Sequence, residues 1–366
     1  MALNIMKSTK KLSFLILIIL IPALLISINV SIKAAAGESQ IIQDLSGRKV
    51  KVPSQIDRIA AVGPGTLRQV LYIDGIKRIV GVEQQEKTEN WYPSYNIAYP
   101  ELKKLPVIGP QHGGDAELIL AQKPQVIFFR GDSGGAKTLK SKTGIPVINI
   151  RLGDFYKNRD TLYQAWKVIG KTLNKDKRAN NLINYTKKLI EDLKQRTKNI
   201  NSEKKPEVFA GGIAHHGGKG LPSTKFPFPP FKFVNALNTA EDDLNYQNVT
   251  SIIVNREKLL SWNPDLIFID AFNLNLVKQD LKQHPEYENI KAVKNNKIYS
   301  LLPYSLYNRN QENILVNSYF IGKTIYPKAF KDINIKAKAD KIFTEFLGKS
   351  IYDKLQKKYI FFEKLD

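Results

Sequence analysis

The sequence predicts an α/β protein built from two similar lobes with mostly parallel sheets. Short apolar runs alternate with helical patterns along the chain, and one helix–proline–strand pattern occurs twice, at 117–128 and 257–268. A glutamate, two aliphatic residues, a proline and an apolar strand fall in the same register in both copies. The offset is too long for a solenoid repeat, so the echo indicates two lobes of one type.

Strands and helices are expected to alternate within each lobe. In the first lobe, a glycine-containing turn leads to a helix at 67–73 that Thr66 can cap, and a second helix is expected at 117–122. The expected strands are 58–63, 79–82, 126–129 and 146–150 in the first lobe, and 207–212, 266–268 and 298–302 in the second.

A helical stretch separates the two lobes. Its second amphipathic helix is expected from about Asp176 to about Lys198, which at 1.5 Å per residue corresponds to about 33 Å. Because such a helix is stiffer than a glycine–serine linker, we expect modest lobe closure. The expected organisation is a signal peptide at 1–36, an N-terminal lobe at 37–158, connecting helices at 159–200 and a C-terminal lobe at 201–366.

The N-terminal segment resembles an export signal. Lys7, Lys10 and Lys11 precede an apolar run at 12–30, and small residues follow at 34–36. Cleavage after Ala36 is the favoured interpretation, and an uncleaved anchor is the alternative. We therefore expect a periplasmic or extracytoplasmic location.

Composition restricts the function further. The chain has no cysteine, which excludes disulfides and a lipidated N-terminal cysteine, so we do not expect a lipoprotein. The formal net charge is +22. A basic excess is compatible with nucleic acid, a membrane surface or an anionic ligand, but export argues against nucleic acid.

Several segments resemble one known family. Asp44-Leu45-Ser46-Gly47-Arg48, followed by Val50, Val52-Pro53 and Arg58-Ile59, resembles the opening of the cluster A (class III) periplasmic binding proteins. These are the receptors of iron-siderophore, haem and cobalamin ABC importers. The two helix–proline–strand units and the segment 291–299 are also similar to elements of that family, in family order.

The resemblance implies a fold and a task. It implies two Rossmann-like lobes joined by a single long helix, with ligand held in a cleft between them. It also implies no catalysis, no intrinsic cofactor, and an ABC permease with its ATPase as partners; we expect a monomer. Arg68 and Gln69 lie near a helix position where many members carry a permease-docking glutamate, so this docking mode is open.

Candidate ligand contacts follow from the rule that open α/β sheets bind ligands beyond the carboxyl ends of their strands. Arginines suit carboxylates, aromatic side chains suit conjugated ligands, and imidazole or phenolate suits a metal. The candidates are Arg68, Trp91, Tyr92, His112, Arg130, His215, His216, Tyr304, Tyr307 and Arg309, with His215, His216 and Tyr304 as possible metal ligands. Each has a structural alternative, such as a salt-bridged turn for Arg68 and loop packing for Trp91 and Tyr92.

The leading hypothesis is a receptor for an iron(III) complex, such as a siderophore, haem or a similar anionic metal chelate. A receptor for cobalamin or for a nickel or cobalt chelate is the alternative. A bare-metal site would need convergent ligands that His112, His215, His216 and Asp270 do not visibly supply. An exported α/β hydrolase is a remote alternative, because the sequence has no Gly-x-Ser-x-Gly nucleophile elbow.

Overall fold

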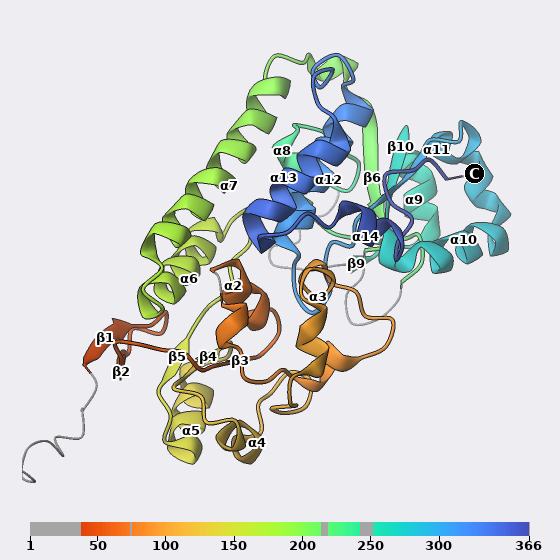
Figure 1. Cartoon of the computed structure of the whole chain (residues 1–366). Coiled ribbons are helices and arrows are strands. Elements are labelled where there is room, and N and C mark those ends of the chain that lie inside the picture. The colour runs from red at the N-terminus through yellow and green to blue at the C-terminus, as the bar shows by residue number, and fades with distance from the viewer. Residues whose placement is uncertain (1–37, 74, 214–218, 242–251, 366) are drawn as a thin grey trace, which may run out of the picture. The chain divides into compact units, whose positions relative to one another are not determined.

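The computed structural model describes residues 38–366, apart from residues 74, 214–218, 242–251 and 366 (Figure 1). The account below concerns the unit Ser39–Asp366. The expected signal at 1–36 lies outside the described residues. Within the described part of the chain, no helix combines the length and the apolar character needed to cross a membrane.

The first lobe contains a three-stranded parallel sheet. Its order is β3 (Ile59–Val62), β4 (Val126–Phe129) and β5 (Val147–Asn149), with β4 in the centre. The expected strand at 79–82 is wrong, because this segment forms only two isolated bridges, Ile79 to Ile59 and Val82 to Val107. The chain leaves the sheet edge between these bridges to pair with a different segment, so no ladder develops.

The second lobe contains a four-stranded parallel sheet. Its strands, in sheet order, are β11 (Ile298–Leu301), β10 (Leu266–Asp270), β6 (Glu207–Gly211) and β8 (Leu237–Asn238). The repeated unit is confirmed, because α9 (Arg256–Trp262) precedes β10 as α4 (Ala116–Ala121) precedes β4. Both strands of the repeat lie inside their sheets.

Helices and two small antiparallel pairs complete the described elements. The pairs are β1 (Ser39–Gln43) with β2 (Lys49–Pro53), and β7 (Ser223–Thr224) with β9 (Ile252–Ile253). The other α-helices are α2 (Thr66–Tyr72), α3 (Ser94–Ala98), α5 (Ser133–Thr143), α6 (Arg159–Thr172), α7 (Asp176–Thr197), α8 (Pro229–Phe233), α10 (Leu274–Gln283), α11 (Lys291–Lys294), α12 (Gln311–Ile325), α13 (Ile335–Leu347) and α14 (Tyr352–Gln356). Short 3₁₀ turns occur at Ile76–Arg78, Gln84–Lys87, Pro100–Lys104, Ser202–Lys204, Ala271–Asn273 and Pro285–Asn289.

The start of α2 differs from the expected cap. The N-cap residue is Gly65 with φ of 82°, and no side chain caps the helix. The hydroxyl of Thr66 instead donates to the carbonyl of Val62 at 3.0 Å. Thr66 therefore fastens the helix to the end of β3 and does not cap its own N–H groups.

Each sheet is apolar on both faces, as strands buried between helices must be. In β10, Leu266 and Phe268 join one apolar cluster, whereas Ile267 and Ile269 face another beneath the outer helices. The strand β3 divides its side chains between two clusters in the same way. The largest cluster includes residues from β3, α7, β10 and α12, so the two lobes share one core.

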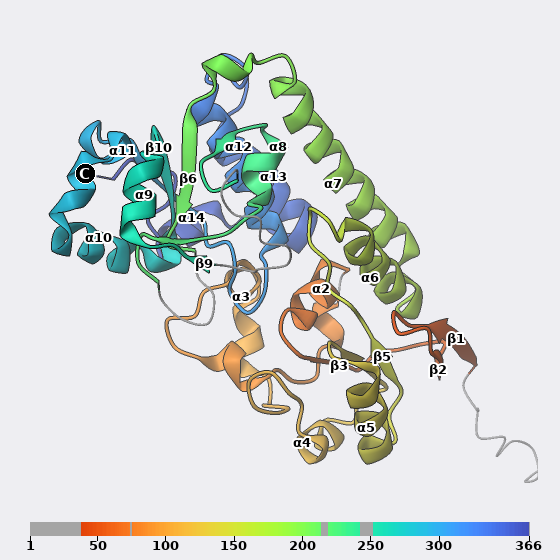
Figure 2. The same cartoon turned by 180° about the vertical axis from the view of Figure 1, so that it is seen from behind.

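Helix α7 joins the lobes as the sequence predicts. It contains 22 residues, packs against α6 on the first-lobe side and contacts α8 and α12 on the second-lobe side (Figures 1 and 2). Its buried face includes Leu182, Leu189 and Leu193. The two α/β lobes joined by one long helix are thus present, whereas the segment boundaries at 158 and 200 stay predictions.

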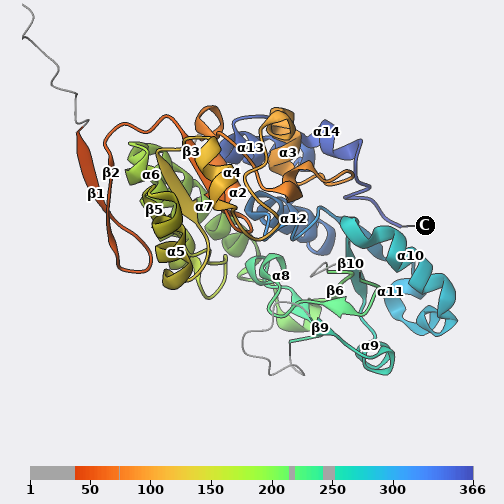
Figure 3. The ribbon, with the colours of Figure 1, turned by 90° about the horizontal axis from the view of Figure 1, so that it is seen from below.

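The N-terminal hairpin explains part of the Asp44–Arg48 motif. The buried carboxylate of Asp44 accepts the N–H groups of Ser46, Arg48 and Asn149, and it pairs with the Arg48 guanidinium at 2.5 Å. Arg48 also donates to the carbonyl of Val147 at 2.9 Å. The hairpin is thereby fixed to β5, and β1 also contacts α6 (Figure 3).

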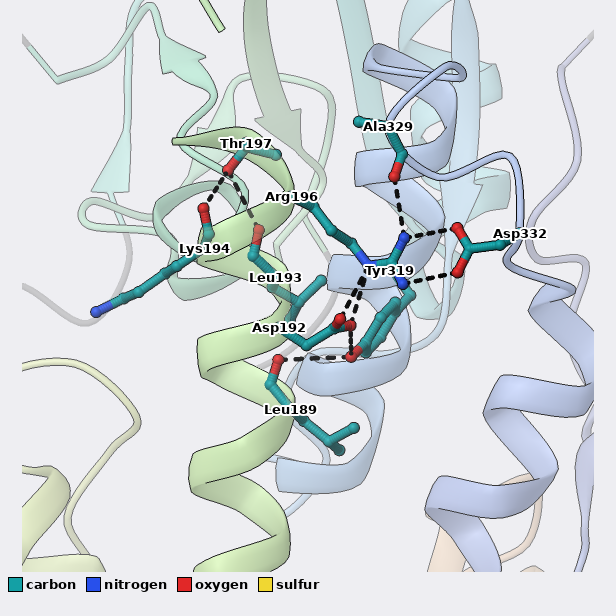
Figure 4. Close-up of polar contacts among 9 residues, drawn as sticks. All are labelled: Leu189, Asp192, Leu193, Lys194, Arg196, Thr197, Tyr319, Ala329 and Asp332. Atoms are coloured by element: carbon teal, nitrogen blue, oxygen red, sulfur yellow. Dashed lines mark hydrogen bonds and ion pairs between the residues drawn. The ribbon is translucent and has the colours of Figure 1, made fainter. Parts of the chain in front are cut away.

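Arg196 anchors the end of α7 to the second lobe (Figure 4). Its guanidinium binds both oxygens of Asp332 at 2.7 and 2.8 Å and donates to the carbonyl of Ala329 at 3.0 Å. Its Nε also donates to Asp192, whose carboxylate accepts the Tyr319 hydroxyl at 2.6 Å. These bonds link α7, α12 and the segment that follows α12.

Replacing Arg196 by methionine should lower the free energy of unfolding by about 2 kcal/mol, because charge-assisted hydrogen bonds to three partners are lost together. Urea unfolding followed by circular dichroism measures the change. Lys194→Met removes an exposed cation from the same turn of α7 and should change the value by less than about 0.5 kcal/mol. Equal effects of the two substitutions would show that the network does not stabilise the fold.

Candidate functional site

A pocket lies at the carboxyl ends of β4 and β5, where the strand-end rule places a ligand. Its volume is about 490 Å³. Arg130 and Gly131 follow β4, and the segment 150–153 follows β5. The complete lining is Arg130, Gly131, Ile150, Arg151, Leu152, Gly153, Asn158 and Thr161.

The second lobe brings three further polar side chains to this region. Tyr304 and Arg309 come from the segment after β11, and Lys225 follows β7. Tyr304 and Lys225 are buried, and the Lys225 ammonium lies 6.0 Å from the centre of the Tyr304 ring. The charge of Arg309 lowers the pKa values of Arg130 and Lys225 and opposes the rise at Tyr304, so all three lie within electrostatic range of its guanidinium.

Arg130, Lys225 and Arg309 are cations that lie close together, and the charge of Arg309 lowers the pKa values of the other two. Burial, and then the charge of Arg309, lower the pKa of Lys225 to about 8, although Asp154 opposes the shift. Partial burial and Arg309 also lower the pKa of Arg130. Among the described residues, Asp154 is the acid that opposes the shift at Lys225, and one of its oxygens already accepts the N–H groups of Tyr156 and Asn158. Arg130, Lys225 and Arg309 are called the cationic group below.

Arg68 has a different position from the one expected of a ligand contact. Its side chain is fully buried, and its Nη atoms donate to the carbonyls of Leu306, Asn308 and Arg309 at 2.6, 3.1 and 2.7 Å. The guanidinium also lies 4.8 Å from the centre of the Tyr95 ring. These contacts hold the turn 305–309, which we call the interlobe turn, against α2.

Tyr307 and His112 belong to the same contact. The Tyr307 hydroxyl donates to Oε2 of Glu83 at 2.9 Å and accepts the backbone N–H of His112 at 2.8 Å. Glu83 also accepts the N–H of Gly63 at 3.0 Å, and burial raises the pKa of its carboxyl to about 7. The His112 ring is exposed and tilted against the Tyr307 ring, at 5.4 Å between centroids.

Two glycines after β3 allow close approaches, one to the interlobe turn and one within the first lobe. A Cβ atom at Gly65 would lie 2.8 Å from the Cβ of Asn308, and one at Gly63 would lie 2.7 Å from the carbonyl oxygen of Arg130. Both have positive φ, 95° at Gly63 and 82° at Gly65. Gly65 therefore serves contact between the lobes, whereas Gly63 lets β3 approach the residue that follows β4.

Trp91 and Tyr92 lie against other parts of the second lobe. Trp91 meets Phe272 edge to face at 6.3 Å, and its indole N–H is buried without a hydrogen-bond partner among the described residues. Tyr92 packs against Tyr359 and accepts the hydroxyl of that residue on its backbone carbonyl at 3.2 Å. No contact with the cationic group is seen for either residue in the described part of the chain.

Of the three candidate metal ligands, the structure describes only Tyr304. His215 and His216 lie outside the described residues. Burial, with a contribution from Asp154, raises the pKa of Tyr304, which opposes formation of a phenolate. Across the described residues, no cluster of three histidine, cysteine, aspartate or glutamate side chains could hold a metal ion. The described residues therefore suit an anion better than a bare cation.

The structure unites Arg130, Tyr304 and Arg309 of the expected contacts and adds Lys225 and Arg151. Arg151 directly follows an expected strand, so the strand-end rule contained a signal for it. Lys225 stands in a proline-rich aromatic stretch beside a strand of only two residues, which periodicity does not reveal.

Comparison with known proteins identifies the family of the chain. Residues 59–304 match the model of the periplasmic binding protein family. The chain is 24% identical over 356 residues to the molybdate-binding protein MolA of Haemophilus influenzae, covering 90% of this chain and 95% of that protein. It is 22% identical over 281 residues to the Fe(3+)-citrate-binding protein YfmC of Bacillus subtilis, covering 74% and 81%.

Solved structures show the same fold. A periplasmic solute binding protein of Veillonella parvula superposes with a TM-score of 0.70 at 22% identity, covering 88% of this chain and 97% of that one. Molybdate-bound MolA of Haemophilus influenzae gives 0.67 at 22% identity, with 85% and 98% covered. The family match spans well over half of the chain, and these relatives are binding proteins rather than enzymes. The chain therefore belongs to the periplasmic binding protein family, in the cluster A group of ABC importer receptors that its sequence resembles.

Proposed function

We propose that this protein captures an anionic iron(III) chelate with carboxylate groups and presents it to an ABC permease in the cytoplasmic membrane. The observation that carries the proposal is the cationic group beside the 490 Å³ pocket. Arg130 and Arg309 come from opposite lobes, so a ligand held by both would bridge the lobes. The signal at 1–36 would export the protein, which we expect to act as a monomer.

Mutual repulsion is the main physical support for an anionic ligand. A cation that is both partly buried and close to other cations gains most when an anion enters. Arg130 and Lys225 both have lowered pKa values for these reasons. Guanidinium groups also bind carboxylates through paired, directional hydrogen bonds. A carboxylate-bearing ligand would therefore relieve the repulsion and accept paired hydrogen bonds from the guanidinium groups.

Pocket size favours a chelate over a single small ion. Pockets for organic ligands usually occupy roughly 300–1,000 Å³, and this one has about 490 Å³. The name of the YfmC relative, an Fe(3+)-citrate-binding protein, agrees with this choice. The metal would arrive inside the ligand, so the protein needs no metal-coordinating cluster of its own.

Molybdate is the second candidate. MolA, whose match covers 90% of this chain and 95% of that protein, is named as molybdate-binding, and a tetrahedral dianion would also suit several cations. A molybdate ion alone would leave much of the pocket to water, which is why we place it second. Ferric citrate and molybdate can be tested side by side on the same protein.

Arg130→Met and Arg309→Met should each weaken ferric citrate binding about tenfold or more in isothermal titration calorimetry. Each removes charge-assisted hydrogen bonds, which contribute about 1.5–3 kcal/mol, and tenfold in affinity corresponds to about 1.4 kcal/mol. Arg58→Met is the matched control, because Arg58 lies at the opposite, amino end of β3 and donates to carbonyls of the segment 122–123.

Binding of ferric citrate that survives both substitutions would disprove the assigned site. If the wild-type protein binds molybdate more tightly than ferric citrate, and both variants lose molybdate binding, the ligand of this site is the oxyanion and not the chelate. Lack of binding by either probe to the wild-type protein would count against both candidates, and a cobalamin or nickel chelate would then be the next ligand to test.

The pH dependence of binding should reveal Lys225. Because its pKa is near 8, its ammonium loses a proton as the pH rises through that value, and the attraction for an anion falls. Lys225→Arg stays charged up to about pH 12. The ratio of wild-type affinity to Lys225→Arg affinity should therefore fall between pH 7 and pH 9.5. Taking the ratio in the same ferric citrate solutions cancels changes in the ligand. A ratio that is independent of pH would place Lys225 outside the site.

A further inference from the structure

The interlobe turn is held in an unusual backbone conformation. Tyr307 and Asn308 both have positive φ, at 50° and 89°, which is uncommon for residues other than glycine. Ser305 and Arg309 close the turn by an antiparallel bridge. Two adjacent left-handed residues persist only where surrounding contacts determine them, so the turn depends on what it touches.

Most of these contacts come from the first lobe. Arg68 binds three carbonyls of the turn, the Tyr307 hydroxyl lies between Glu83 and the N–H of His112, and the Asn308 amide donates to the carbonyl of Pro64 at 3.2 Å. Arg309 ends this turn. Its own carbonyl is the acceptor at 2.7 Å from Nη1 of Arg68.

We propose that Arg68 is a positioning residue for ligand binding, which acts by fixing the backbone of Arg309 so that the Arg309 side chain joins Arg130 and Lys225. Arg68 itself never touches the ligand, because its guanidinium is buried and engaged by carbonyls of the turn. Glu83 supports the same placement through Tyr307.

The geometry distinguishes this role from general stabilisation. Arg309 is the one member of the cationic group whose backbone is bonded directly to an arginine of the opposite lobe, among the contacts of the described residues. Without Arg68, the carbonyls of Leu306, Asn308 and Arg309 would lose their shared donor inside a buried contact. The turn would then relax toward ordinary backbone angles. The Arg309 side chain would leave the position that the present left-handed angles of Tyr307 and Asn308 give it.

The inference rests on the proposed anion site, so its test has one arm with ligand and one without. In the first arm, ferric citrate affinity is measured by calorimetry for Arg68→Met, Arg309→Met and the double variant. Arg68→Met should weaken binding about tenfold, and Arg68→Lys should restore part of the loss. The double variant should bind no more weakly than Arg309→Met alone, because Arg68 acts only through Arg309.

Arg178→Met is the matched control. Arg178 is partly buried, whereas Arg68 is fully buried, and it too binds backbone carbonyls of distant segments, those of Tyr72 at 2.9 Å, of Glu345, and of Phe346 at 3.5 Å. It lies on α7 and not at the turn. It should lower thermal stability without changing ferric citrate affinity. An equal loss of affinity in Arg178→Met would overturn the proposal, because the effect of Arg68 would then be general destabilisation.

The second arm follows Lys225 without ligand. The ¹³Cε resonance of Lys225, assigned by its loss in Lys225→Arg, is titrated by NMR in ¹³C-lysine-labelled protein. Since the Arg309 charge lowers the pKa of Lys225, Arg309→Met should raise it, and Arg68→Met should raise it in the same direction. Arg178→Met should leave it unchanged.

The two arms separate the possible failures. An unchanged Lys225 titration in Arg68→Met, together with a clear change in Arg309→Met, would overturn the positioning role while keeping the anion site. If Arg309→Met leaves ferric citrate affinity intact but Arg68→Met still shifts the Lys225 titration, the assigned ligand site fails and the positioning of Arg309 stands.

Discussion

A buried arginine needs hydrogen-bond acceptors, and for Arg68 these are backbone carbonyls of the opposite lobe. This requirement explains several neighbouring features. Gly65 leaves room for the interlobe turn, the turn contains two residues with positive φ, and Glu83 holds Tyr307 beside the same contact. The candidate site is thus built beside a contact between the lobes that is polar and buried.

The fold could be predicted because its signals are local. Strand periods, proline breaks and the amphipathic pattern of α7 all lie within short windows, and the repeated unit around β4 and β10 placed both sheets. The errors at Ile79–Val82 and Thr66 have a common cause. In both cases the local structure depends on a partner in another element. Val82 forms a β-bridge with Val107 instead of extending the sheet, and the Thr66 hydroxyl donates to the carbonyl of Val62.

The site was only partly accessible to the same reasoning. Arg130 and Arg309 follow strands, so the rule that ligands bind at strand ends made both of them candidates, and the structure places them within electrostatic range of each other. Arg68 also follows a strand, yet the sequence cannot tell a guanidinium that faces a ligand from one that faces carbonyls more than 200 positions later. Lys225 illustrates the reverse difficulty, because it reaches the cationic group from an irregular segment whose neighbouring strand has two residues.

The shared apolar core has a consequence for how this chain could be divided. The two halves carry the same helix–proline–strand unit and look like separable modules. However, one cluster of buried side chains runs from β3 through α7 to β10 and α12, so each half would expose a large apolar face on its own. A fragment ending within α7 would therefore aggregate rather than fold. The repeat describes the architecture of the protein, whereas the largest apolar cluster of the described residues belongs to both halves at once.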